Sequence, residues 1–337
     1  MKLFYKCTFF DDNFVPKDNF SIAQYEISLK NTLSNQRSSF TKKEIEYKCK
    51  WESAESFDHI KPCVLIPIKD HLELLKKTIK NLVDNDMCKI ANIVIIDDRS
   101  SNDIKSVLDQ DMSYLRVDNN NGFNFSMLNN IAAKICHSLG AKEIVLWNAD
   151  LWTPNKTTFP RLLKKHRDES CSLSGTKLIY PPKKMSLRGE EDTKNIRDYF
   201  PSMLNGRWRE TIQFGGDVFF NNSFHHYGRF LDKNDYRVNV DRPSNFITGA
   251  FQIINLDDFI EVGGLNPSLS KNYQDVDLCM KMLSEDKKVY YFGKSCHMYH
   301  DESALMCEEK KNKGLLSDSV LFNKIWKADE FLRIVVP

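Results

Sequence analysis

Short apolar runs alternate with helix-like stretches along residues 63–150, and this alternation limits the folds that the chain can adopt. Four strands are expected, at residues 63–66, 93–96, 114–117 and 144–147, and the first, second and fourth are apolar runs typical of strands buried on both faces. Between them, apolar residues recur at helical spacing, at Leu72, Leu75, Ile79 and Leu82, at Val107 and Leu108, and at Phe125, Leu128, Ala132 and Ile135. The sequence therefore predicts an α/β fold with a mostly parallel central sheet flanked by helices.

Polar side chains follow the ends of these predicted strands. The fourth run ends on Asn148 and Asp150, and Pro154 prevents any continuation of regular structure. Open α/β sheets bind ligands at the carboxyl ends of their strands, where carboxylates suit a divalent cation, ribose hydroxyls and a base edge. The alternative, that Asp150 only caps a turn, stays open on these residues alone. The earlier strands are followed by three more carboxylates, Asp70, Asp97 and Asp98.

Composition and missing motifs exclude several classes of protein. The net charge of +2 over 337 residues argues against a dedicated nucleic-acid binder. There is no Gly-x-Gly-x-x-Gly after the first strand and no P-loop motif. The nine cysteines include no Cys-x-x-Cys pair, which favours reduced thiols over disulfides or a zinc site. With no apolar run near the roughly 18 residues of a membrane span, we expect a cytoplasmic protein.

The chain divides into three expected parts. Residues 1–60 are rich in aromatics and are expected to form an ordered extension that packs on the main domain. Residues 61–303 form the main domain, in which residues 181–245 show little periodicity. A helix is expected to begin after Asn272 as its N-cap. Residues 304–337 form a tail with an amphipathic helix over residues 315–326.

Several segments resemble the motifs of one known family, in that family's order. They are residues 64–67 (Val-Leu-Ile-Pro), 95–100 (Ile-Ile-Asp-Asp-Arg-Ser), 121–123, 146–150 (Leu-Trp-Asn-Ala-Asp), 248–250 with 262–265 leading into 273–279 (Tyr-Gln-Asp-Val-Asp-Leu-Cys), and 299–303. From about residue 62 to 303 the chain resembles GT-A glycosyltransferases of the family 2 type, particularly the bacterial rhamnosyltransferase-like branch. The resemblance implies the GT-A fold for the main domain.

The resemblance also implies an activity, an inverting transfer from a nucleotide sugar (a UDP- or dTDP-sugar) to a hydroxyl of a glycan or lipid-linked acceptor. It implies a divalent cation, Mn²⁺ or Mg²⁺, and no nucleic-acid partner. The implied setting is bacterial surface polysaccharide such as capsule or lipopolysaccharide, with peripheral association at the inner face of the cytoplasmic membrane where the acceptor is lipid-linked.

Site residues follow from the same motifs. Asp275 corresponds to the catalytic base, and Asp150 and His300 correspond to the metal ligands. The acceptor side would include Gln274, Asp277, Thr248 and Gly249. The donor nucleotide would contact Pro67, Asp97, Asp98, Asn121, Gly122 and Asn148.

Two residues depart from the family's pattern. Asn148 replaces the first Asp of the Asp-x-Asp motif, which leaves Asp150 as the main carboxylate for the metal. Gln274 replaces a Glu beside the expected base; it can orient an acceptor hydroxyl by hydrogen bonding but cannot itself be a base. A carboxylate at Asp275 would also stabilise a helix start without any catalysis.

Two other functions stay open at this point. A sugar nucleotidyltransferase would need a Gly-rich basic phosphate loop after the first strand, which residues 67–71 do not provide. A catalytically silent module that binds sugar or nucleotide would be consistent with Gln274. Metal-dependent turnover separates that module from an enzyme.

Overall fold

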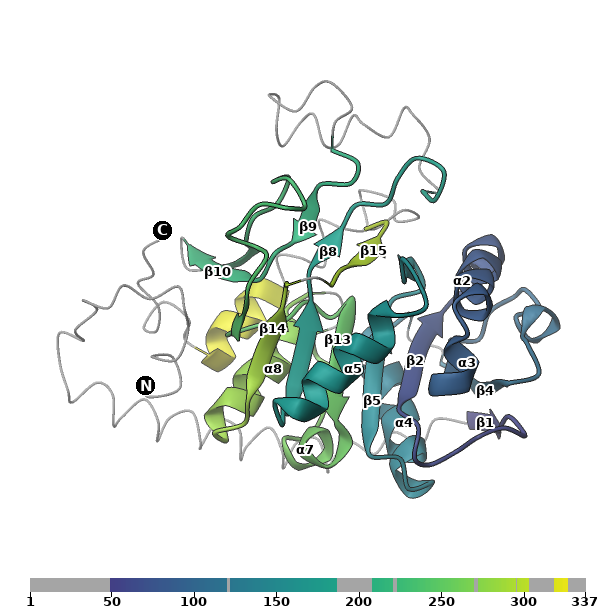
Figure 1. Cartoon of the computed structure of the whole chain (residues 1–337). Helices are drawn as coiled ribbons and strands as arrows, with labels where there is room; N and C mark the ends of the chain where they lie inside the picture. Colours follow the sequence, from purple (N-terminus) through teal and green to yellow (C-terminus); the bar gives the residue numbers. More distant parts are fainter. Residues whose placement is uncertain are drawn as a thin grey trace.

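The computed structural model describes residues 49–119, 122–186, 208–220, 223–269, 272–294, 296–302 and 318–326. The expected nucleotide-binding Asn121 lies outside the described residues, as do residues 1–48 of the expected N-terminal extension. Figure 1 shows the described chain as a central sheet with helices on both faces.

Nine strands form the central sheet, in the order β1-β4-β3-β2-β5-β13-β7-β14-β12. The first five are β1 (Cys49–Glu52), β4 (Met112–Val117), β3 (Asn92–Asp97), β2 (Cys63–Ile68) and β5 (Glu143–Trp147). The other four are β13 (Phe251–Asn255), β7 (Leu173–Thr176), β14 (Val289–Phe292) and β12 (Asp241–Pro243). The predicted α/β fold with a central sheet and flanking helices is therefore confirmed.

The sheet is mixed. Strands β4, β3, β2 and β5 pair in parallel, as the alternation of strands and helices predicts. Strand β13 runs antiparallel to both β5 and β7, and β1 and β12 are antiparallel to their neighbours. Parallel pairing thus dominates only the half of the sheet that is built from residues 63–147.

Helices cover both faces of this sheet. They are α2 (Leu72–Asp84), α3 (Met87–Ile90), α4 (Phe125–Ser138), α5 (Thr158–Asp168), α7 (Leu256–Glu261) and α8 (Gln274–Ser284), with a 3₁₀ turn over Lys105–Val107. Figure 1 shows α5 in front of the sheet and α4 behind it. Helix α2 buries Leu75, Ile79 and Leu82, three of the four positions predicted from its helical spacing.

A second, four-stranded sheet lies beside the end of β5. Its order is β6 (Leu151–Trp152), β15 (Met298–His300), β8 (Leu178–Ile179) and β9 (Ile212–Phe214). A separate hairpin joins β10 (Asp217–Phe220) to β11 (Ser223–His226). The expectation of an irregular region over residues 181–245 is thus wrong for part of it, because strands of three or four residues are too short to produce a recognisable alternation.

The strand order identifies where a ligand can bind. From β2 the chain runs outward through β3 to β4, and then it crosses back so that β5 lies on the other side of β2. Open α/β sheets bind ligands outside the carboxyl ends of the strands at such a reversal. Here those ends are Ile68 of β2 and Trp147 of β5.

Pro67 does not end its strand. The strand expected over residues 63–66 continues through Pro67 to Ile68 and pairs with β3 as far as Asp97. On its other side, β2 pairs with β5 only up to Leu65. Pro67 therefore lies beyond the point where that neighbour still pairs, so its missing N–H removes no bond to β5.

Two peripheral segments pack on the central domain. Strand β1 pairs antiparallel with β4, and the rings of Trp51 and Phe57 meet edge to face at 6.5 Å. Residues 318–326 form a helix, drawn in yellow in Figure 1, that lies beside α8. In the part of the chain that the structure describes, no helix combines the length and the apolar character needed to cross a membrane.

Candidate active site

The turn after β5 carries the first candidate residues, and local packing fixes its shape. Trp147 is fully buried, and its ring meets those of Phe159 and Phe251 edge to face at 6.2 and 5.6 Å. Its indole N–H donates to the carbonyl of Leu151 at 2.9 Å, which closes the turn over residues 148–150. The apolar run that predicts the strand therefore also anchors the polar turn behind it.

Asp150 and His300 meet across the second sheet. His300 of β15 lies opposite Leu151 of β6, and the N–H of Asp301 donates to the carbonyl of Asp150 at 3.0 Å. This pairing leaves His300 Nε2 3.3 Å from Asp150 Oδ1, with side-chain exposures of 6% and 14%. The two predicted metal ligands are thus neighbours in space.

Their mutual attraction determines their charge states. Burial alone would lower the pKa of His300, but the carboxylates around it, chiefly Asp150, raise that pKa above its usual value. Burial would likewise raise the pKa of Asp150, but His300 outweighs this effect and holds that pKa below its usual range. Each side chain therefore favours the charged form of the other where no cation is bound, and His300 must be neutral to ligate one.

The same pair suits a divalent cation. A carboxylate oxygen and an imidazole nitrogen both face one point, and the amide nitrogen of Asn148 lies 3.4 Å from His300 Nε2. His300 Nδ1 is buried and has no hydrogen-bond partner among the described residues. Within those residues no third His, Cys, Asp or Glu completes a metal-binding group. Two protein ligands are enough for Mg²⁺ or Mn²⁺ when substrate phosphates and water supply the others.

Asp98 lies at the end of β3, where the donor nucleotide was expected. It is fully buried, its backbone N–H donates to the carbonyl of Ile68, and its carboxylate contacts two side chains. Lys69 Nζ lies 3.2 Å from Oδ2, and Asn119 Nδ2 donates to Oδ1 at 3.0 Å. Asn119 also donates to the carbonyl of Gly122, whose φ of +84° suits glycine. Asp98 thus connects the loops after β2, β3 and β4.

Asp97 has a different environment. It is fully buried, and its carboxylate accepts from the Tyr114 hydroxyl and the Arg116 guanidinium, both at 2.6 Å, and from the Ser100 N–H at 2.8 Å. Burial, followed by the Asp97 carboxylate, raises the pKa of Tyr114 to about 12. These bonds hold the turn after β3 in place. On the other side of β3, Pro67 is buried within β2.

Asp275 stands at the start of α8. Its carboxylate accepts from the backbone N–H groups of Gly249 at 2.7 Å and Val276 at 2.9 Å. A Cβ on Gly249 would lie 3.1 Å from Asp275 Cβ, so glycine permits this approach. Burial raises the pKa of Asp275 above its usual value, although the two N–H donors oppose the change. Such a carboxylate is a stronger base than an exposed one.

The residues around Asp275 complete this part of the site. Thr248 is buried, its carbonyl accepts from the N–H of Phe251, and Gln274 is half-buried next to Asp275. The N-cap of α8 is Tyr273, with a φ of +62°, and not Asn272 as expected. The helix begins one residue later than expected, after Tyr273, whose left-handed backbone lies beside Phe322, a contact that the local sequence does not show.

Asp277 faces away from Asp275. It is fully buried, lies 2.8 Å from Lys281 Nζ, and accepts from the indole N–H of Trp326 at 2.9 Å. Two residues on a helix are rotated by about 200°. The two carboxylates of α8 therefore serve different surroundings, and only Asp275 lies against the loop that contains Gly249.

One charged group near His300 was not predicted. Glu302 Oε1 lies 2.7 Å from Arg229 Nη2, and the Tyr180 hydroxyl donates to Glu302 Oε2 at 2.8 Å. Arg229 also donates to the Tyr180 hydroxyl at 3.0 Å. Arg229 belongs to the region without periodicity, and the only sequence signal for it was the pair of acidic residues after His300, which a cation would stabilise.

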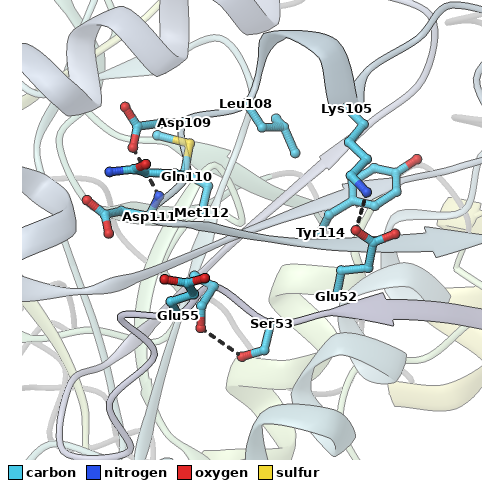
Figure 2. A pocket seen from close by; sticks show the side chains of 11 residues that line it. Glu52, Ser53, Glu55, Lys105, Leu108, Asp109, Gln110, Asp111, Met112 and Tyr114 are labelled. Carbon is cyan, nitrogen blue, oxygen red and sulfur yellow. Dashed lines mark hydrogen bonds and ion pairs between the residues drawn. The ribbon is translucent and has the colours of Figure 1, made fainter.

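A separate pocket of about 370 Å³ lies elsewhere. Figure 2 shows it beside the amino-terminal half of β4, with the Lys105 side chain extended toward Glu52. Its lining includes the carboxylates of Glu55, Asp109 and Asp111. It is at the opposite end of β4 from the strand ends that carry the candidate site.

Comparison with known proteins gives distant similarities. No protein-family model matches the chain. The chain is 22% identical over 282 residues to the uncharacterized protein y4gI of Sinorhizobium fredii (strain NBRC 101917 / NGR234). That match covers 80% of this chain and 28% of the other, so the chain spans less than a third of its relative's length.

Two solved structures are similar in fold. GalNAc-T7 with UDP, GalNAc and Mn²⁺ matches at a TM-score of 0.49 and 15% identity, over 72% of this chain and 44% of the other. The mannosyltransferase PcManGT from Pyrobaculum calidifontis, with GDP-Man and Mn²⁺, matches at 0.48 and 12% identity, over 92% of this chain and 80% of the other. Both scores lie below 0.5, so the function proposed below rests on the residues of the site.

Proposed function

We propose that this protein is a metal-dependent glycosyltransferase of the GT-A type that moves a sugar from a nucleotide-sugar donor to an acceptor hydroxyl with inversion. The observation that carries the proposal is the meeting of Asp150 and His300 at 3.3 Å beside the carboxyl end of β5. The motif-like segments that contain these two residues are far apart in the sequence, and they converge at the switch point of the sheet.

The donor would lie across the ends of β2, β3 and β5. Asp98, with its carboxylate between Lys69 and Asn119, would accept from the base or ribose. Gly122 and Asn148 would line the same crevice. A UDP- or dTDP-sugar fits the family resemblance. A Mn²⁺ or Mg²⁺ ion bound by Asp150 and His300 would neutralise negative charge on the diphosphate.

Asp275 would be the general base. Its half-buried carboxylate takes the proton from the acceptor hydroxyl while the hydroxyl oxygen attacks the anomeric carbon. The bond from that carbon to the diphosphate breaks at the same time, and the nucleoside diphosphate leaves with the electron pair. Because attack and departure occur on opposite faces, one displacement inverts the carbon and forms no covalent intermediate with the protein.

The acceptor side would include Thr248, Gly249 and Gln274. Gln274 can donate to or accept from an acceptor hydroxyl and so orient it toward Asp275. We propose a glycan or lipid-linked acceptor in bacterial surface polysaccharide synthesis, with the protein at the inner face of the cytoplasmic membrane during transfer.

The test is a panel of UDP-, dTDP- and GDP-sugars, each with Mn²⁺, with Mg²⁺ and with excess chelator. We expect metal-dependent release of the nucleoside diphosphate, and stabilisation of about 2.7 kcal/mol by a donor at a hundred times its Kd. Stabilisation without turnover under any condition would instead identify a silent binding module. Full turnover in chelator would contradict the metal role.

A further inference from the structure

The helix over residues 318–326 packs against the start of α8. Phe322 and Trp326 are each 1% exposed although the helix lies at the edge of the domain. Side chains from one face of this helix make three contacts. They contact the residue before the N-cap of α8, the N-cap itself and the first turn of α8.

The first contact is to the backbone ahead of α8. Asp318, 4% exposed, accepts from the N–H of Asn272 at 3.0 Å. A carboxylate that binds a backbone N–H in this way holds the chain at the point where the helix is about to begin.

The second contact is to the N-cap. Tyr273 has a φ of +62°, a left-handed conformation that is rare for a bulky residue and costs about 1 kcal/mol or more. Its ring stacks on that of Phe322, with centroids 4.8 Å apart and planes inclined by 23°. Such a conformation persists only where its surroundings hold it, and Phe322 is one of the groups that do so here.

The third contact is to the first turn of α8. The Trp326 indole N–H donates to Asp277 Oδ1 at 2.9 Å, while Lys281 Nζ lies 2.8 Å from Oδ2. Lys281 also donates to the carbonyl of Gly264 at 2.8 Å. All three side chains are buried, so these bonds fix the rotation of the helix about its axis.

The same first turn carries Asp275, on the opposite side from Asp277. Its carboxylate reaches the Gly249 N–H only if the helix start keeps both its rotation and its backbone conformation. Asp275, which lies against the loop that contains Gly249, and Asp277, which binds Trp326, are thus two residues apart on one rigid turn.

We propose that Asp318, Phe322 and Trp326 of the C-terminal helix are positioning residues for Asp275. The inference rests on the proposed function for its catalytic consequence, since Asp275 is the base only in that reaction. Its structural part, that the C-terminal helix sets the Asp275 contact with Gly249, stands independently and can be measured without substrate.

The structural test uses Trp326→Phe and Phe322→Leu, which remove the indole N–H and the ring stacking while keeping most of the buried volume. Val320, 48% exposed on the same helix, gives the matched control Val320→Ala. Amide hydrogen exchange at Gly249 should accelerate about tenfold in the two test variants and not in the control. Unchanged exchange at Gly249 in both folded test variants would overturn the inference.

The kinetic test follows transfer with the donor identified by the panel. Each test variant should lose about ten- to a hundredfold in kcat, because small displacements of a catalytic group are costly. The donor KM should stay within about twofold, since the donor contacts lie at β2, β3 and β5. A fall in thermal stability with kcat unchanged would show that the helix only stabilises the fold and would refute positioning.

The two tests separate the two proposals. If wild-type protein transfers no sugar but Gly249 exchange responds to Trp326→Phe, the proposed reaction fails and the structural inference holds. If wild-type protein transfers sugar but neither exchange nor kcat responds, the reaction holds and the inference is rejected.

Discussion

The backbone N–H of Asn148 donates to the carbonyl of Ala250 at 3.0 Å. This bond joins the turn that contains Asp150 to the loop whose Gly249 N–H binds Asp275. The two expected halves of the site, the metal pair and the base, are therefore connected through adjoining backbone of β5 and β13, which pair at Trp147 and Phe251.

Removing either member of the metal pair should affect turnover unequally. Asp150→Ala should abolish metal-dependent transfer, because it deletes the only carboxylate of the pair, while His300→Ala should reduce it. Asn148→Asp should be tolerated, since it restores the commoner form of the motif and adds a further oxygen ligand. Transfer rates titrated against Mn²⁺ give the measurement, and equal rates for wild type and Asp150→Ala would contradict the metal assignment.

The two carboxylates at the end of β3 should separate binding from stability. Asp98→Asn should weaken nucleotide binding with or without metal, as measured by calorimetry, in addition to any loss of stability from removing the partner of Lys69. Asp97→Asn should lower the melting temperature, because it removes the buried carboxylate that lies 2.6 Å from Arg116 and leaves only the more distant Asp118. Nucleotide affinity in folded Asp97→Asn should stay near wild type. If nucleotide affinity fell in Asp97→Asn and not in Asp98→Asn, the roles of the two carboxylates would be exchanged.

The two carboxylates of α8 should behave in the same contrasting way. Asp275→Asn keeps the size and much of the helix-start function, so the protein should fold, but transfer should fall by about 10²–10⁴-fold. Asp277→Asn leaves the buried Lys281 without a counter-charge and should cost about 3–5 kcal/mol of folding free energy. Near wild-type transfer by Asp275→Asn would place the base elsewhere.

Buried neutral histidines should make the fold sensitive to mild acid. Burial lowers the pKa of His166 to about 4, and its Nδ1 lies 2.8 Å from the Ser174 hydroxyl. The unfolded chain binds a proton at this side chain below its ordinary pKa of about 6.5, whereas the folded chain does not. The stability due to neutral His166 is thus complete above pH 6.5 and is lost as the pH falls toward 4.

The measurement for His166 is the free energy of unfolding at several pH values between 7.5 and 4. His166→Asn keeps a polar atom near the Nδ1 position and cannot take up a proton, so its stability should fall less over this range. Burial also lowers the pKa of His297 to about 4 and that of His226 to about 3, and both should contribute a remaining slope in the variant. Identical slopes for the two proteins would contradict the assignment.

Sequence patterns over a few residues were sufficient to predict those parts of the candidate site that depend only on residues nearby in the sequence. The strand ends at Asp98 and Asp150 and the helix start at Asp275 are local features, because each follows directly from an apolar run or a helical stripe. The meeting of Asp150 with His300 required the family resemblance. No periodicity in the sequence indicates that β15 pairs with β6.

Other features depend on contacts between distant residues and carried no local signal. Tyr273 takes a left-handed conformation beside Phe322 and is the N-cap of α8 in place of Asn272, whose N–H donates to Asp318. Strand β2 passes through Pro67 only because β5 stops pairing earlier. Arg229 reaches Glu302 across 73 residues of sequence. Side-chain chemistry can suggest that such partners exist but cannot identify them.

The pairing of β6 with β15 also orders events during synthesis. Asn148 and His300 are 152 residues apart, and the intervening chain contains most of the second sheet and half of the first. A ribosome releases the chain from its amino end, so the parallel half of the sheet can form long before His300 emerges. A nascent chain therefore holds Asp150 without its partner, and the two side chains can act together only after residue 300 has emerged.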